Sequence, residues 1–166
     1  IQRFSLLLGQ PSLSLLAVIG AMLLGSGLGS LYSSRFPMRV LTRRVMMFAL
    51  LTAAGIVLSL VIHPAIIRWA LPLSIELRFV VTLLAILPLG FVMGVPFPSG
   101  LRMADEADSR GIAAFWGANA VMSVVGSVLA MSLAVGVGFS AALVVGAALY
   151  AVVAGIVRLT WRQMLN

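Results

Sequence analysis

The chain has 166 residues, 62% of them hydrophobic, and a mean hydropathy of +1.18. A water-soluble globule of this composition would expose large apolar patches, so a soluble fold is excluded. The net charge of +7 comes from eleven arginines and four acids. These arginines lie beside apolar runs, as orientation signals do, so we predict no nucleic-acid partner. Cysteine is absent, which excludes disulfides and thiolate chemistry.

Four stretches carry no charge: residues 4–34, 45–67, 79–101 and 111–157. Because about 20 apolar residues cross the ~30 Å hydrocarbon core as a helix, the first three stretches hold one span each and the fourth holds two. We therefore predict an all-α fold, a polytopic transmembrane helical bundle in the lipid bilayer, with residues 1–166 as one membrane domain. The predicted spans are residues 13–32, 45–62, 78–93, 113–134 and 139–157.

The chain begins at Ile1 and has no basic segment before its first apolar run. This pattern is not that of a signal peptide. We expect a segment of a longer polypeptide, a mature chain after processing, or a part of a larger complex.

The distribution of arginines predicts the orientation of the chain. With five spans, eight arginines fall on one side of the membrane and three on the other. Cytoplasmic loops carry the excess of positive charge, so we expect the N-terminus outside and the C-terminus in the cytoplasm. The eight are Arg35, Arg39, Arg43, Arg44, Arg102, Arg110, Arg158 and Arg162, and the three are Arg3, Arg68 and Arg78.

The first predicted span carries small residues at four-residue spacing, Ala21, Gly25 and Gly29. Such a face lets a second helix approach closely in lipid, so we predict that Gly25 and Gly29 pack against another helix. The glycine-rich run also resembles a phosphate-binding loop, but it lacks the lysine and the strand that such a loop requires.

The second predicted span ends at His63 and Pro64, because proline disfavours helix for the preceding residue. His63, the single histidine of the sequence, is the one candidate for ligating a metal cofactor, since imidazole is a common axial donor. The reading that we favour is an interfacial histidine beside a turn, and we predict no cofactor. Residues 64–77 are expected to form a short helix on the outer surface.

The third predicted span is interrupted by prolines and glycines. Pro88 lies inside it, and four further residues of these types crowd the next segment: Gly94, Pro96, Pro98 and Gly100. Because these residues oppose a regular helix, we expect a broken helix over residues 94–100. It is either a kinked end with a tight loop or a broken helix lining a polar site. The acids after it, Asp105, Glu106 and Asp108, are expected in a solvated loop.

Polar and small residues form stripes on the last two predicted spans. Asn119, Ser123 and Ser127 follow one another at steps of four, with Gly126 on the same face. An amide in a membrane needs a partner, so we predict that these residues join neighbouring helices, with contact to a bound polar ligand as the alternative. Gly136, Val137 and Gly138 predict a tight hairpin before the fifth span, whose Gly146 also lies on a small-residue face.

Several of these motifs together carry a resemblance to a known family. They are residues 1–11, 25–30, 94–102, 115–120 and 123–130. The chain resembles the C-terminal membrane half of bacterial spermidine-synthase-like, methyltransferase-like polytopic membrane proteins, although it has Gln10 where histidine is common. The resemblance implies a bacterial inner membrane location, with the chemistry in a soluble Rossmann-type domain that this sequence does not contain.

The sequence predicts no catalytic residues and no metal site. One histidine, no cysteine and acids confined to a loop and to Glu76 do not assemble a nucleophile, a base and an oxyanion site. The leading hypothesis is a non-catalytic membrane subunit or domain that packs against other transmembrane helices or subunits. The alternative is a transporter-like or ligand-binding membrane domain that uses the broken third span.

Overall fold

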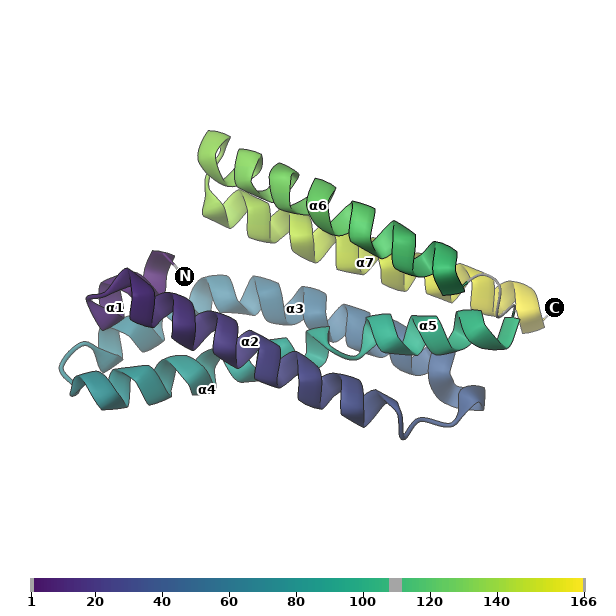
Figure 1. Cartoon of the computed structure of the whole chain (residues 1–166), viewed down its shortest axis with the longest axis horizontal. Coiled ribbons are helices and arrows are strands. Elements are labelled where there is room, and N and C mark those ends of the chain that lie inside the picture. Colours follow the sequence, from purple (N-terminus) through teal and green to yellow (C-terminus); the bar gives the residue numbers. More distant parts are fainter. Residues whose placement is uncertain (1, 108–111, 166) are drawn as a thin grey trace.

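The computed structural model describes residues 2–107 and 112–165, and these residues form helices joined by short turns (Figure 1). The described part contains no strand, which confirms the predicted all-α fold. The helices are α1 (Gln2–Leu8), α2 (Pro11–Ser33), α3 (Met38–Ala70), α4 (Ile75–Met93), α5 (Pro96–Ala107), α6 (Ile112–Gly136) and α7 (Phe139–Leu165).

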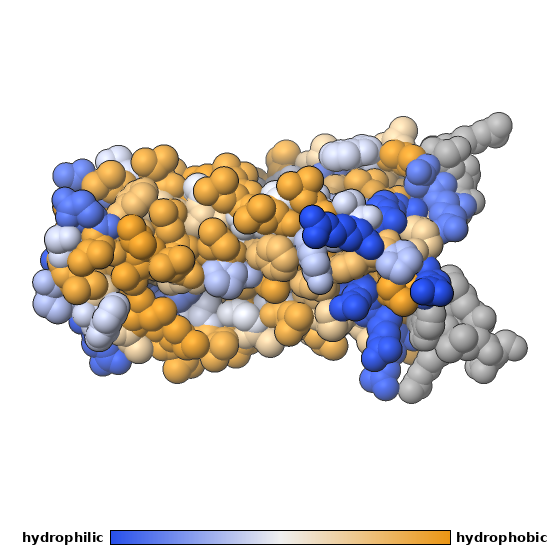
Figure 2. Space-filling view, turned by 90° about the horizontal axis from the view of Figure 1, so that it is seen from below, coloured by the Kyte–Doolittle hydropathy of each residue, from blue (hydrophilic) through white to orange (hydrophobic). Residues whose placement is uncertain are grey.

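Five helical segments are long and apolar enough to cross a membrane, as predicted. They are Pro11–Ser33, Met38–Ala70, Ile75–Glu106, Ile112–Gly136 and Phe139–Leu159, with mean hydropathies between 1.8 and 2.6. Figure 2 shows apolar residues over the middle of the molecule and hydrophilic residues gathered at its two ends. This banding matches an apolar bilayer core between two polar surfaces, so the structure indicates a multi-pass membrane protein.

The second span does not end at Pro64. Helix α3 continues through this residue to Ala70, so the predicted helix end at His63 and the separate surface helix over residues 64–77 are wrong. Proline removes the backbone donor that would bond the carbonyl four residues earlier, which is that of Leu60. The Arg3 guanidinium Nη1 donates to the Leu60 oxygen at 3.3 Å and replaces the missing bond.

The third span does not show the predicted broken segment. Pro88 lies inside α4, the helical path pauses only at Gly94 and Val95, and α5 then runs from Pro96 past Gly100. The irregular conformation expected for residues 96–100 is therefore wrong. Pro96 and Pro98 occupy the first turn of α5, where backbone N–H groups have no partner within the helix and proline is tolerated.

Helices α2 and α4 make the most extensive helix–helix contact of the chain. Two pairs of glycines meet there, each at four-residue spacing: Gly25 and Gly29 on α2, and Gly90 on α4 with Gly94 directly after its end. A Cβ atom at Gly94 would overlap the backbone of Ser26. The backbones approach so closely that side chains are excluded, which is how helices pack in lipid through small residues.

The same restriction holds on the α2 side of this crossing. A Cβ atom at Gly25 would lie 2.5 Å from the carbonyl oxygen of Leu87, and one at Gly29 would overlap the carbonyl of Phe91. The predicted packing role of these two glycines is thus fulfilled within the chain, by α4.

Helix α1, which the sequence analysis did not predict, closes one end of the bundle. Phe4 and Leu7 of α1 are buried with Ala21 of α2, Ala70 of α3 and Ile86 of α4 in one apolar cluster. Gly9, with φ of 68°, makes the turn into α2. The short helix joins the ends of three spans.

Helices α6 and α7 form the predicted hairpin, with a turn at Gly138 whose φ of 114° suits glycine alone. This hairpin packs loosely. Only 6% of the most apolar 18 residues of α6 are buried, compared with 33% in α2, and Ala134 is the one buried residue described on α6. α7 contacts α3, so the hairpin joins the bundle on that side (Figure 1).

We expect Gly29→Ala to lower the free energy of unfolding in detergent by about 1 to 3 kcal/mol, because its methyl group would overlap the Phe91 carbonyl. Gly27→Ala is the matched control, since no atom lies within 4 Å of a Cβ placed there. Its stability should stay the same or rise by up to ~1 kcal/mol through helix propensity. Thermal unfolding followed by circular dichroism measures both, and equal stability of the two variants would contradict the close crossing.

Candidate functional site

The polar stripe of α6 is the part of the predicted site that the chain leaves open. Ser123 and Ser127 are exposed, and each hydroxyl donates to the carbonyl four residues earlier, at 2.7 Å. Asn119 is half-buried, and among the described residues its amide makes no hydrogen bond. The structure therefore satisfies the two hydroxyls locally and leaves the amide without a neighbour to bond.

The glycines of the α6–α7 hairpin are also open. A Cβ atom at Gly126 or Gly146 would have no heavy atom within 4 Å. At Gly25 and Gly29, by contrast, backbone atoms of α4 occupy the space that a Cβ atom would need. Among the predicted packing glycines, Gly25 and Gly29 of α2 thus lie in close contact with another helix. Gly126 of α6 and Gly146 of α7 do not.

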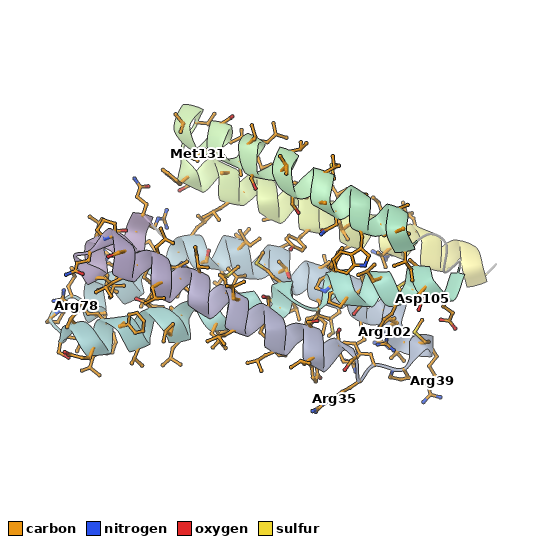
Figure 3. The ribbon with its side chains drawn as sticks, in the orientation of Figure 1. Arg35, Arg39, Arg78, Arg102, Asp105 and Met131 are labelled. Carbon is orange, nitrogen blue, oxygen red and sulfur yellow. The ribbon has the colours of Figure 1, made fainter. Side chains whose placement is uncertain are left out.

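Arg102 forms an interaction that the sequence analysis missed. Its Nη1 donates to the Ser33 oxygen at 2.9 Å and its Nη2 to the Phe36 oxygen at 3.0 Å, so it caps the end of α2 (Figure 3). Guanidinium groups suit this role because their donors form a planar fork. The sequence pattern predicts Arg102 in a loop as a topology signal, whereas it lies on α5.

Arg78 also bonds backbone carbonyls, at the opposite end of the bundle (Figure 3). Its guanidinium donates to the carbonyls of Leu7, Leu71 and Leu73. These oxygens belong to the end of α1 and to the turn after α3, and they have no partner in a helical ladder. The sequence alone does not show that Arg78 caps helix ends, because its acceptors are backbone atoms and one of them lies far along the chain.

Aromatic rings pack around the end of α2 that Arg102 caps. Tyr32 lies edge-on to Phe36, with ring centroids 5.0 Å apart, and its ring centroid is 5.6 Å from that of Phe91 on α4. The Arg44 guanidinium carbon lies 5.3 Å from the Phe36 ring centroid, in cation–π contact. These contacts tie α2, α3 and α4 together at this end of the bundle.

His63 packs against an aromatic ring. Its imidazole lies edge-on to Phe4 of α1, with ring centroids 5.2 Å apart. Within residues 2–107 and 112–165, no group of three histidine or acidic side chains gathers as a metal site would require. The geometry gives His63 a packing contact between α3 and α1.

The segment for which a tight loop or a polar site was expected lies in a helix from Pro96 onward. Ser99, in the first turns of α5, is buried, and its hydroxyl has no partner in the part of the chain that the structure describes. A serine hydroxyl rotates readily to the carbonyl one turn earlier, so one such group does not define a ligand site. The described acids Asp105 and Glu106 are exposed on α5, and Asp108 lies outside the described residues.

Comparisons with known proteins add no relative. No protein-family model, no curated protein and no solved structure matches this chain.

We expect Arg102→Lys to lower the free energy of unfolding by about 1 to 3 kcal/mol, because lysine keeps the charge and loses the fork that bonds two carbonyls. Arg39→Lys is the control, since Arg39 is exposed near the same end and makes no contact that the structure describes. Thermal unfolding in detergent measures both variants. Equal melting would show that Arg102 contributes charge alone.

Proposed function

We propose that this chain is a non-catalytic integral membrane subunit or domain that packs against other transmembrane helices in a larger assembly. The observation that carries this proposal is the exposure of α6, a 25-residue apolar helix with a single buried residue described. A partner helix on α6 would remove this surface from lipid and supply the contacts that the chain itself lacks.

Asn119 supplies the hydrogen-bonding group of the proposed partner surface. A side-chain amide in a membrane is stabilised by a hydrogen bond to a neighbouring helix, worth about 0.6 to 2 kcal/mol. Gly126 leaves room beside it for close backbone approach. A partner helix with a polar side chain among small residues fits this surface best.

The proposed location is the bacterial inner membrane, with the N-terminus outside and the C-terminus in the cytoplasm. Two features support this orientation. Eight of the eleven arginines fall on one side of the five predicted spans, and Arg35, Arg39 and Arg102 lie at one end of the bundle (Figure 3). Membership of the spermidine-synthase-like membrane family belongs to the same proposal and is supported by the sequence motifs alone.

We expect Asn119→Leu to reduce recovery of the partner chain from native membranes in mild detergent by about 3- to 30-fold, the loss of one interhelical hydrogen bond. Asn119→Gln retains an amide and should recover most of the partner. Quantitative mass spectrometry of the co-purified chains measures both variants. Unchanged recovery with leucine would remove Asn119 from the interface.

A crosslinking control separates this interface from the rest of α6. The sequence has no cysteine, so Ser123→Cys and Val121→Cys each introduce a single thiol. Two residues correspond to about 200° around a helix, which places the two thiols on opposite sides. Crosslinks to a partner through position 123 and not 121 support the proposed surface, and the reverse result rejects it.

Labelling of single cysteines tests the orientation. Ser34 and Ser74 are both exposed, and they lie in turns at opposite ends of the bundle. With the proposed orientation, Ser74→Cys reacts with a membrane-impermeant thiol reagent in intact cells and Ser34→Cys reacts only after lysis. The opposite pattern would invert the topology.

A further inference from the structure

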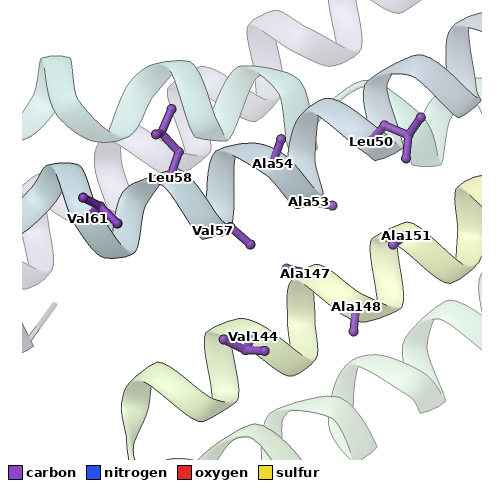
Figure 4. Close-up of a pocket in the computed structure, with 10 residues that line it drawn as sticks. All are labelled: Leu50, Ala53, Ala54, Val57, Leu58, Val61, Val144, Ala147, Ala148 and Ala151. Carbon is purple, nitrogen blue, oxygen red and sulfur yellow. The ribbon is translucent and has the colours of Figure 1, made fainter.

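Helices α3 and α7 line a shallow apolar groove that is largely open (Figure 4). Its volume is about 760 Å³, and it is open along one side. Its walls are all aliphatic: Leu50, Ala53, Ala54, Val57, Leu58 and Val61 of α3, with Val144, Ala147, Ala148 and Ala151 of α7. The alanines make the groove hollow, because a larger side chain at these positions would fill it.

We propose that this groove, which we call the α3–α7 groove, holds one acyl chain of a phospholipid whose phosphate group binds Arg3. The site is independent of any partner on α6. It assigns Arg3 a ligand in addition to its structural bonds.

Arg3 lies at one end of the groove. Its Nη2 donates to the Ser140 hydroxyl at 3.0 Å and its Nη1 to the Leu60 oxygen at 3.3 Å. Leu60 precedes the groove residue Val61, and Ser140 lies one helical turn before Val144. The guanidinium is thus held between the two walls of the groove.

The charge of Arg3 has no counter-ion within the part of the chain that the structure describes. A guanidinium group has five N–H donors, and two of these are used. The other donors remain for phosphate oxygens, which suit this fork. Ser140 follows the Gly138 turn between two predicted spans, so Arg3 lies at the level of this turn, where the proposal places the lipid headgroup.

The length of the groove fits an acyl chain. From Leu50 to Val61 the helix rises about 16 Å, close to half of the ~30 Å hydrocarbon core, which is the length of one leaflet's chains.

Native mass spectrometry tests the proposal on the full chain, purified in detergent with added palmitoyl-oleoyl phosphatidylglycerol. We expect the wild type to retain one phospholipid per chain. Arg3→Gln should lower the retained fraction about tenfold through loss of a charge-assisted hydrogen bond. The double variant Ala54→Leu with Ala148→Leu, which fills the groove at two exposed positions, should lower it by a similar factor.

Two control variants separate specific retention from general effects. Arg68→Gln removes an exposed arginine at the same end of α3, and Ala65→Leu adds bulk to α3 outside the groove. Both should retain lipid as the wild type does. Equal retention by Arg3→Gln and Arg68→Gln overturns the headgroup assignment, and so does a wild type that retains none.

A crosslinking measurement keeps the test valid if a variant fails to fold. Wild-type protein in nanodiscs of phosphatidylglycerol and phosphatidylcholine, with a trace of phosphatidylglycerol carrying a diazirine in its acyl chain, should be labelled most strongly at residues 50–61 and 144–151. Uniform labelling of all lipid-facing helices overturns the proposal. A groove shielded from lipid by a second copy or by another chain also overturns it, and the crosslinked peptides identify that occupant.

Discussion

The bundle depends on the close approach of α2 and α4. At this crossing Gly25 and Gly29 meet Gly90 and Gly94, and backbone lies against backbone. Lipid provides no hydrophobic force to bring helices together, so van der Waals contact over this surface replaces it. The other connections follow from this one, because α1 packs across the ends of these helices and α5 continues from α4 beside the end of α2.

The sequence predicted those parts of the fold that depend on local pattern. Long uncharged runs gave the five spans, and Gly138 gave the hairpin turn. It did not predict that α3 continues through Pro64. The hydrogen bond that replaces the one lost there comes from Arg3, which lies 57 residues from its acceptor, Leu60. The sequence placed Gly25 and Gly29 in a packing face but could not identify α4 as the partner, since a small-residue face specifies closeness and not the neighbour. Arg78 and Arg102 were missed as caps for a related reason: their acceptors are backbone carbonyls, which every sequence has.

Two regions of the molecule differ in how closely their helices pack. The α2–α4 crossing is tightly packed backbone against backbone and the end of α2 carries ring contacts, whereas α6 contacts the rest of the chain sparsely. The surfaces on which the proposals depend lie on α6 and between α3 and α7, and the α2–α4 crossing lies apart from them. Arg3 joins these parts directly, since it bonds both α3 and the first turn of α7.

The cap on α2 also sets an order of events during synthesis. The Ser33 carbonyl bonds a guanidinium that lies 69 residues later in the chain. At usual elongation rates, synthesis of these 69 residues takes about 3 to 14 s. Until α5 has emerged, the end of α2 can bond only to water or to lipid headgroups at the membrane surface. The cap on Ser33 therefore forms only after α5 has been synthesised, later than the α2–α4 crossing can form.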